Sequence, residues 1–248
     1  MVTLDSFQNK INAVVVGASG GIGKALVEQL LAYPSVAQVH ALTRNADSFQ
    51  SSSEKLKVSA VDILDETSVE RASESVSDTP VDLLIIASGI LHGENVSPEK
   101  SLRTFQRDSF AQVMEVNTIA PMLVAKHFLS KMNRRDRSVF SVISARVGSI
   151  SDNHLGGWYS YRASKAALNM LLKTLSIESR RTMPNLIIAG LHPGTVDTRL
   201  SKPFQRNVKP EKLFTPYQSA TYLLNVVNDL SVEQSGNLFA WDGQLIEP

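Results

Sequence analysis

Short apolar runs rich in valine, isoleucine and leucine alternate along the chain with longer segments in which apolar residues recur every three or four positions. The runs are typical of buried strands, and the longer segments are typical of amphipathic helices. We expect seven strands, at residues 11–16, 36–43, 56–61, 81–87, 138–144, 186–191 and 238–241. Their alternation with helices predicts an α/β fold with a doubly wound parallel sheet and helices on both faces.

The expected helices cover residues 24–32, 105–132, the segment around Tyr161 that ends near 181, and 216–229. Pro121 should interrupt or bend the second of these, because proline lacks a backbone N–H. A length of 248 residues allows one domain or two. We expect a single domain that spans residues 1–248.

The chain has a formal net charge of +1 and contains no cysteine. The near-neutral net charge argues against a nucleic-acid partner, because a protein that binds nucleic acid usually has a basic surface. Disulfides and thiolate metal sites are excluded, and because the histidines are scattered we expect no metal. Residues 1–10 do not resemble a secretory signal, and no run of about 18 apolar residues could span a membrane. We therefore expect a cytoplasmic protein with no membrane partner.

A glycine-rich turn, Gly17-Ala18-Ser19-Gly20-Gly21-Ile22-Gly23, separates the first strand from the first helix. Glycines there permit sharp backbone geometry, and the free N–H groups of the helix attract an anion such as a pyrophosphate. The same letters also satisfy G-x-S-x-G, the nucleophile turn of serine hydrolases, with Ser19 as nucleophile. That alternative is the poorer one, because no strand precedes the first to support such a turn.

Tyr161 and Lys165 are four residues apart in a segment with helical apolar spacing. On a helix they share one face, and the ammonium is expected to lower the pKa of the phenol. Such a phenol would be a proton donor for work near neutral pH. Taken alone the spacing is a weak signal, because Tyr and Lys often fall four apart on solvated helix faces.

Further residues along the chain strengthen this signal, because together with Tyr161 and Lys165 they form an ordered set. In sequence order they are Gly17, Gly21 and Gly23, Asp62, Asn117, Ser144, Tyr161 and Lys165, and Pro193-Gly194. This set resembles the short-chain dehydrogenase/reductase superfamily over nearly the whole chain. The segment 159–169 and the ending Trp241-Asp242-Gly243 resemble its C-factor-like and carbonyl-reductase-like members. The resemblance implies a Rossmann fold with strand order 3-2-1-4-5-6-7 and an oxidoreductase acting on a small-molecule carbonyl or alcohol.

The resemblance implies a catalytic role for four residues. Tyr161 would transfer the proton, Lys165 would assist it, Ser144 would bind the substrate oxygen, and Asn117 would join a water-mediated relay to Lys165. Taken singly, Ser144 could merely end a strand and Asn117 could be a polar residue on a wet helix face. The chain also departs from the superfamily, with Val16 in place of a frequent Thr and Ile86-Ala87-Ser88-Gly89 in place of Asn-Asn-Ala-Gly.

The residue after the second strand bears on the cofactor. An acidic residue there would bind the ribose hydroxyls of NAD, but the chain has Arg44, whose guanidinium can bind a phosphate. NADP(H) is therefore favoured and NAD(H) is possible, since Arg44 could also stack on adenine in either nucleotide. The expected cofactor-binding residues are Gly17, Ser19, Gly21, Ile22, Gly23, Arg44, Asn45, Asp62, Ile63, Ala87, Ser88, Gly89, Tyr161, Lys165, Pro193, Gly194, Thr195, Val196 and Thr198.

Residues 195–214 contain two prolines, several basic residues and little periodicity. We expect a substrate lid there, although a surface loop is nearly as compatible with the composition. Residues 92–103 and 151–158 should complete the pocket rim. A homodimer or homotetramer is possible by resemblance. An alternative function is a cofactor-binding signalling protein of the same fold with little turnover.

Overall fold

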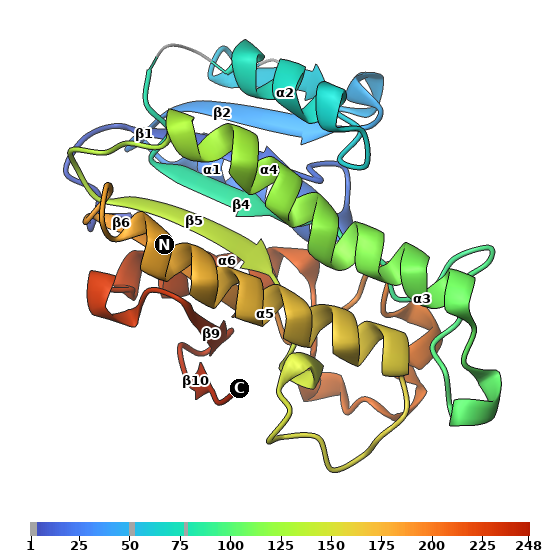
Figure 1. Ribbon diagram of the computed structural model, residues 1–248. Helices are drawn as coiled ribbons and strands as arrows, with labels where there is room; N and C mark the ends of the chain where they lie inside the picture. Colours follow the sequence, from blue (N-terminus) through green and yellow to red (C-terminus); the bar gives the residue numbers. More distant parts are fainter. Residues whose placement is uncertain (1–3, 50–52, 77–78) are drawn as a thin grey trace.

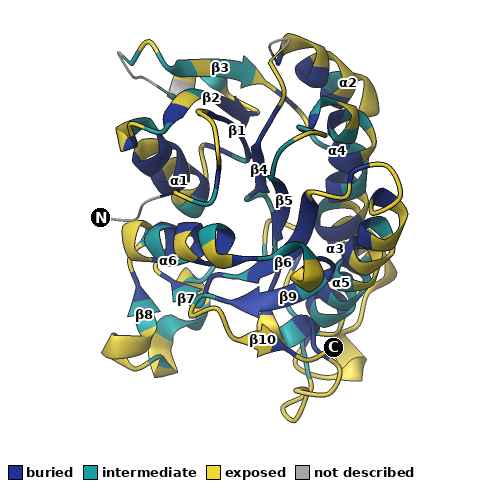
Figure 2. Ribbon diagram, turned by 90° about the vertical axis from the view of Figure 1, so that its left-hand side faces the viewer, coloured by how far each residue is buried: buried dark blue, intermediate teal, exposed yellow. Residues whose placement is uncertain are grey.

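Every residue of β1 (Ile11–Val16) is buried, because helices cover both faces of the sheet to which this strand belongs (Figure 2). The structure, a computed structural model, describes residues 4–49, 53–76 and 79–248. Ala13 and Val15 point into the apolar layer on one side, whereas Val14 and Val16 point into the layer on the other. This alternation with a period of two explains why an unbroken apolar run is required of a central strand.

The main sheet has the order β10-β9-β6-β5-β4-β1-β2-β3. Seven strands run parallel and confirm the expected order. They are β3 (Leu56–Ala60), β2 (Val36–Thr43), β1, β4 (Leu83–Ile86), β5 (Ser138–Ile143), β6 (Leu186–His192) and β9 (Asn237–Ala240). A short strand that was not expected, β10 (Leu245–Ile246), pairs antiparallel with β9 and extends that edge.

The helices form two layers (Figures 1 and 2). α1 (Gly21–Ala32) and α6 (Pro216–Asp229) contribute leucines and valines to the apolar layer on one face of the sheet. The other face is covered by α2 (Glu66–Ser75), α4 (Ala120–Phe128) and α5 (Tyr159–Ser179). None of the helices in the described ranges combines the length and apolar character needed to cross a membrane.

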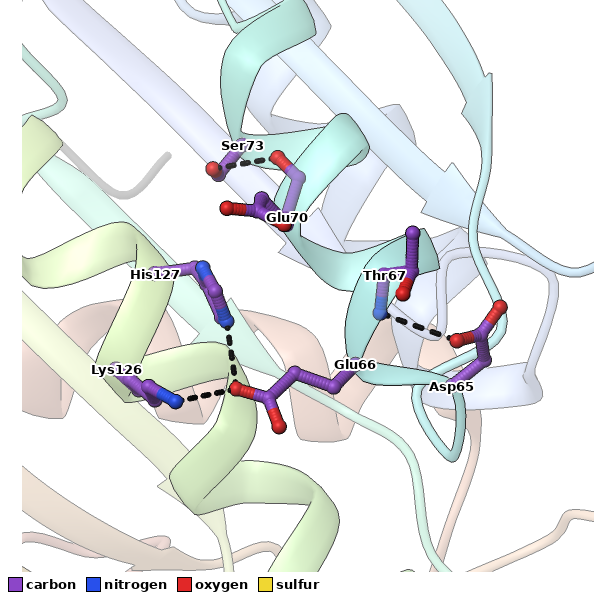
Figure 3. Close-up of polar contacts among 7 residues, drawn as sticks. All are labelled: Asp65, Glu66, Thr67, Glu70, Ser73, Lys126 and His127. Carbon is purple, nitrogen blue, oxygen red and sulfur yellow. Dashed lines mark hydrogen bonds and ion pairs between the residues drawn. The ribbon is translucent and has the colours of Figure 1, made fainter.

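The helix α2 was not expected, because its sequence buries only three residues and is otherwise polar. Its start is capped by Asp65, whose Oδ1 accepts a hydrogen bond from the Thr67 N–H at 3.0 Å. Glu66 then links α2 to α4, since its Oε1 lies 2.5 Å from Lys126 Nζ and 3.1 Å from His127 Nε2 (Figure 3). Contacts with a neighbouring helix therefore support a segment whose own apolar pattern is weak.

The expected long helix over 105–132 is divided in the structure. α3 (Arg107–Met114) passes through a π-helical turn, Glu115–Ile119, into α4. The turn lies just before Pro121, whose ring nitrogen cannot continue the regular hydrogen-bond ladder. The interruption therefore occurs where proline predicted it, and it takes the form of a π turn, which is often found at functional sites.

Two very short strands enclose the segment expected to be a lid. β7 (Thr195–Val196) pairs in parallel with β8 (Leu213–Phe214), so the two ends of residues 195–214 lie side by side. The chain between them forms short 3₁₀ turns at Lys202–Asn207 and Pro210–Lys212. A segment anchored at both ends and irregular between them has the geometry of a lid, which remains a prediction.

Candidate active site

The expected catalytic side chains come together where β5 ends and α5 begins. Ser144 follows β5 directly and is 2% exposed, and Lys165 on the second turn of α5 is 3% exposed. Lys165 Nζ donates a 2.9 Å hydrogen bond to the carbonyl oxygen of Ile143, the residue before Ser144. The ammonium thus lies at the carboxyl edge of the sheet, which is where open α/β sheets bind ligands.

Burial determines the pKa values of the Tyr161 and Lys165 pair. It raises the pKa of the Tyr161 phenol to about 12 and lowers the pKa of Lys165 to about 8. The Lys165 nitrogen lies 5.8 Å from the centre of the Tyr161 ring and is bonded to a backbone carbonyl. The expectation that Lys165 lowers the phenol's pKa is therefore wrong for the protein alone, because desolvation outweighs the neighbouring charge.

The depressed pKa of Lys165 predicts how stability depends on pH. Between about pH 8 and 10.5 the unfolded state binds more protons at this lysine than the folded state, so stability rises with pH. We expect the free energy of unfolding to increase by about 2 kcal/mol between pH 8 and 9.5. Urea unfolding followed by circular dichroism at several pH values measures it.

Two variants test the source of that increase. Lys165→Met should remove it, whereas Lys173→Met, at an exposed position of the same helix, should retain it. An increase of the same size in Lys165→Met would show that other groups cause it.

Ser144 has a partner that the sequence reading missed. Its Oγ donates to Oδ1 of Asn169 at 2.7 Å. Asn169 lies four residues after Lys165 and eight after Tyr161, so the three share one face of α5. That spacing was available in the sequence, but an asparagine in a helix carries no chemical signal until the serine opposite it is known.

Asn117 sits in the π turn and is fully buried. Its Oδ1 accepts from the Ile90 N–H at 2.8 Å, and its Nδ2 donates to the Ile90 carbonyl at 2.9 Å and to Ser164 Oγ at 3.1 Å. The side chain therefore joins the loop after β4 to α5. A Cβ on Gly89 would lie 3.3 Å from Asn117 Oδ1 and 3.7 Å from Lys165 Nζ, so this glycine leaves space between the two.

The glycine-rich turn has the geometry expected for an anion cradle. Gly17 has φ +79°, and a Cβ on it would lie 2.8 Å from the Ser88 nitrogen. A Cβ on Gly23 would lie 2.2 Å from the Gly17 carbonyl oxygen. The first turn of α1 has neither a side-chain cap nor an acidic residue, so its N–H groups and its dipole remain available to a pyrophosphate.

Polar groups around this turn also fit a dinucleotide. Ser19 Oγ accepts a 2.7 Å hydrogen bond from Thr43, which links the turn to the end of β2. Ser88 Oγ is buried and has no partner among the described residues, so it could donate to a bound group. Ile22, in the first turn of α1, is half-buried, and so are Ala87 and Gly89 beside Ser88.

The expected adenine and ribose contacts lie at the ends of β2 and β3, which pair in parallel. Arg44 and Asn45 follow β2 and are exposed. The Asp62 carboxylate accepts a hydrogen bond from the Leu64 N–H at 3.0 Å and forms the turn before α2, with Ile63 half-buried beside it. A guanidinium exposed at this edge could bind a phosphate.

The segment after β6 closes the other side of this region. The Pro193 carbonyl accepts from Ser219 Oγ, and Gly194 has φ +76° with Phe214 and Trp241 packed where a Cβ would be. Thr195 and Val196 form β7. The Thr198 methyl group lies 2.7 Å from the position of a Cβ on Gly21, so the start of residues 195–214 rests on the glycine-rich turn.

An apolar cluster surrounds Tyr161. The Trp158 ring lies 6.2 Å from the Tyr161 ring and 5.0 Å from the Phe204 ring, and both contacts are edge-to-face. His92 meets Phe204 at 5.8 Å. The other members are Leu91, Ala145, Val147 and Leu200. The two segments expected at the rim, 92–103 and 151–158, and the expected lid, 195–214, therefore all reach Tyr161 or its neighbours.

His192, before the Pro193 turn, has a buried Nδ1 atom with no partner among the described residues. Burial lowers the pKa of this imidazole to about 4, and Arg146 adds to the effect. The ring is therefore neutral near pH 7. It is too weak a base to compete with Tyr161 for the role of proton-transfer group.

Comparison with known proteins places these features in a family. The profile described as short chain dehydrogenase matches residues 11–209. The chain is 29% identical over 187 residues to 1-hydroxy-2-glutathionyl-2-methyl-3-butene dehydrogenase of Rhodococcus sp., covering 75% of this chain and 78% of that protein. It is 28% identical over 169 residues to C-signal of Myxococcus xanthus, covering 68% and 93%.

Among solved structures, NADPH-bound carbonyl reductase from chicken fatty liver matches with a TM-score of 0.82 at 26% identity, covering 98% of this chain and 96% of that one. Carbonyl reductase Sniffer of Drosophila melanogaster has the same TM-score at 20% identity, which supports the fold. The family profile covers the glycine-rich turn, the strand ends and the start of α5. The chain thus belongs to the short-chain dehydrogenase family and is an oxidoreductase that acts on the carbonyl–alcohol couple.

Proposed function

We propose that the protein is an NADP(H)-dependent carbonyl reductase in which Tyr161 transfers the proton. The observation that carries the proposal is the arrangement of Tyr161, Lys165 and Ser144 at the edge of the sheet that also bears the glycine-rich turn. The NADPH named in the chicken carbonyl reductase structure supports the choice of nucleotide. When bound, a nicotinamide would supply the hydride.

The chain's own groups would then handle the proton. With a pKa near 12, the Tyr161 phenol is protonated at neutral pH and can donate to a carbonyl oxygen during reduction. Once the proton has left, the Lys165 ammonium would attract the phenolate and offset part of the desolvation that raises the pKa of Tyr161. A relay that returns the proton would pass Gly89, whose missing side chain leaves room between Lys165 and Asn117.

Ser144 would donate a hydrogen bond to the carbonyl oxygen of the substrate. Its existing bond to Asn169 limits when it can do so. A hydroxyl has one proton, and here that proton is directed to Asn169 Oδ1. Ser144 can donate to a substrate only by leaving Asn169 or by accepting from the Asn169 NH₂ after the amide has turned. In the second arrangement Asn169 would orient the hydroxyl toward the substrate.

The apolar cluster beside Tyr161 would exclude water from the reaction. Leu91, Ala145 and Leu200 offer no hydrogen bond through their side chains, so charge that develops on the substrate oxygen interacts mainly with Tyr161 and Ser144. Phe204 and Leu200 belong to residues 195–214, so movement of this segment would open the site to substrate.

Arg44→Ala tests the choice of nucleotide. Arg44 is exposed at the end of β2, and a guanidinium there would bind the 2′-phosphate of NADPH. We expect the Kd for NADPH to rise about tenfold and the Kd for NADH to change less than about twofold. Titration of nucleotide fluorescence measures both. Equal losses would mean that Arg44 contacts the adenine rather than the phosphate.

The proposal itself is tested by a screen of aldehydes, ketones and quinones with NADPH and NADH, following absorbance at the wavelength of the reduced nicotinamide. Oxidation of NADPH by at least one carbonyl is the expected result. The relative named C-signal is not named for a reaction, which favours a signalling protein as the second candidate. Tight NADPH binding without turnover across the panel would support that candidate instead.

A further inference from the structure

Glu99 is a buried carboxylate outside the expected catalytic set. Its side chain is 2% exposed and forms no ion pair in the described part of the chain. Its two oxygens accept from Ser160, one from the N–H at 3.2 Å and the other from the hydroxyl. A buried carboxylate is costly unless it is fully hydrogen-bonded, and here the N-terminus of α5 provides the donors.

Glu99 also holds the residue before α5. Its backbone oxygen accepts from the Trp158 N–H at 2.5 Å, and a Cβ on Gly157 would lie 3.3 Å from that oxygen. Side chain and backbone of one residue are therefore bonded to both sides of the point where α5 begins. This contact joins the loop after β4 to the helix that carries Tyr161 and Lys165.

Trp158 has a strained backbone. With φ 52° and ψ 43° it is the one non-glycine residue with positive φ in the described ranges. It follows Gly156 and Gly157, whose φ values are +64° and +65°. A bulky residue remains in this left-handed conformation only where its surroundings hold it, and such strain is concentrated at functional sites.

The conformation places the Trp158 ring against Tyr161 and Phe204. The ring is part of the apolar cluster beside the proton donor and faces residues 195–214. An indole at that position would offer a flat, polarisable surface to a substrate bound beside Tyr161. Flat aromatic groups pack on such a surface better than puckered rings of equal size.

We propose that Glu99 is a positioning residue that fixes Trp158 as a wall of the carbonyl pocket, and that this wall gives preference to carbonyls bearing a flat aromatic group. The inference rests on the proposed function for its substrate class, whereas the positioning of Trp158 by Glu99 stands on the contacts alone. Glu99 acts through Ser160 and Trp158 and does not touch the reacting atoms.

The kinetic test compares benzaldehyde with cyclohexanecarbaldehyde, two aldehydes of similar size with a flat and a puckered ring. The ratio of their kcat/KM values is followed across variants, so their different intrinsic reactivities cancel. We expect Trp158→Leu and Glu99→Ala each to lower the ratio about fivefold, mainly through KM for benzaldehyde. Glu99→Gln, which keeps an acceptor for Ser160, should stay within about twofold of the wild type.

Asp82→Ala is the matched control. Asp82 is likewise buried and accepts two hydrogen bonds, from the Asn12 N–H and from Asn133 Nδ2, at the opposite end of β4. It should lose stability without changing the ratio. If Asp82→Ala lowered the kcat/KM ratio as much as Glu99→Ala does, Glu99 would only stabilise the fold. If Trp158→Leu left the kcat/KM ratio unchanged, the preference for aromatic carbonyls would be refuted.

The second readout needs no substrate. The chain has two tryptophans, so in a Trp241→Phe background the emission comes from Trp158. Glu99→Ala should shift this emission to the red and lower its anisotropy, while Glu99→Gln should leave both unchanged. Unaltered emission in Glu99→Ala overturns the positioning role, whatever the kinetics show. If Glu99→Ala does not fold, Glu99→Asp, which withdraws the carboxylate by one methylene, replaces it.

The two readouts separate the inference from the function on which it rests. A wild-type protein that reduces no carbonyl with either nucleotide would defeat the proposed function and the substrate class, but the fluorescence experiment would still decide whether Glu99 holds Trp158.

Discussion

Tyr161→Phe should lower kcat for carbonyl reduction by about a thousandfold or more and leave the Kd for NADPH nearly unchanged. The substitution removes the hydroxyl and keeps the ring, which packs against Trp158 in the apolar cluster. Only the proton transfer is lost, so the effect belongs to turnover and not to binding. Single-turnover absorbance measures the first quantity and nucleotide fluorescence the second.

Tyr159→Phe is the matched control for this variant. Tyr159 lies two residues earlier on the same helix, is 41% exposed and is not four residues before Lys165. It should retain normal turnover. Substantial activity in Tyr161→Phe, or an equal loss in Tyr159→Phe, would remove Tyr161 from the role of proton donor.

Gly23→Ala should raise the Kd for NADPH about a hundredfold and lower the melting temperature. The new Cβ would lie 2.2 Å from the Gly17 carbonyl oxygen and 2.9 Å from its carbon. Both are backbone atoms, so the turn must open to admit the methyl group, at a cost of about 3 kcal/mol. Opening moves the N–H groups that would bind the pyrophosphate.

Gly93→Ala separates this effect from the general result of replacing a glycine by alanine. A Cβ at Gly93 meets no atom within 4 Å. Its nucleotide affinity and melting temperature should therefore be close to those of the wild type. Normal affinity in Gly23→Ala, measured by fluorescence titration and differential scanning fluorimetry, would show that the turn does not bind the pyrophosphate.

The two variants address different parts of one edge of the sheet. Gly23 follows β1 and Tyr161 follows β5, and the carboxyl ends of these parallel strands lie on the same side. A dinucleotide held at the first would extend toward the second. We expect Gly23→Ala to lose NADPH affinity while keeping kcat, and Tyr161→Phe to lose kcat while keeping NADPH affinity. Such a result would assign nucleotide binding to the glycine-rich turn and proton transfer to Tyr161.

The local pattern of the sequence was sufficient for most of the fold. Buried strands in a parallel sheet must be apolar on both faces, so residues 11–16 and 186–191 could be located without knowing their neighbours. The strand order followed from a resemblance carried by glycines and by the Tyr161–Lys165 pair. α2 was missed because it is largely polar and packs on the sheet through only Val69 and Ala72, while Asp65 caps its start.

The sequence by itself determined which elements form and which residue types could carry the chemistry, because periodicity and spacing are local properties of a chain. Only the tertiary structure decided the electrostatics, since burial raises the pKa of Tyr161 where the four-residue spacing to Lys165 suggested a decrease. It alone paired Ser144 with Asn169 and Glu99 with the start of α5. These pairs join residues 25 and 61 positions apart. Their energies depend on distance and desolvation, which folding creates and which no local pattern contains.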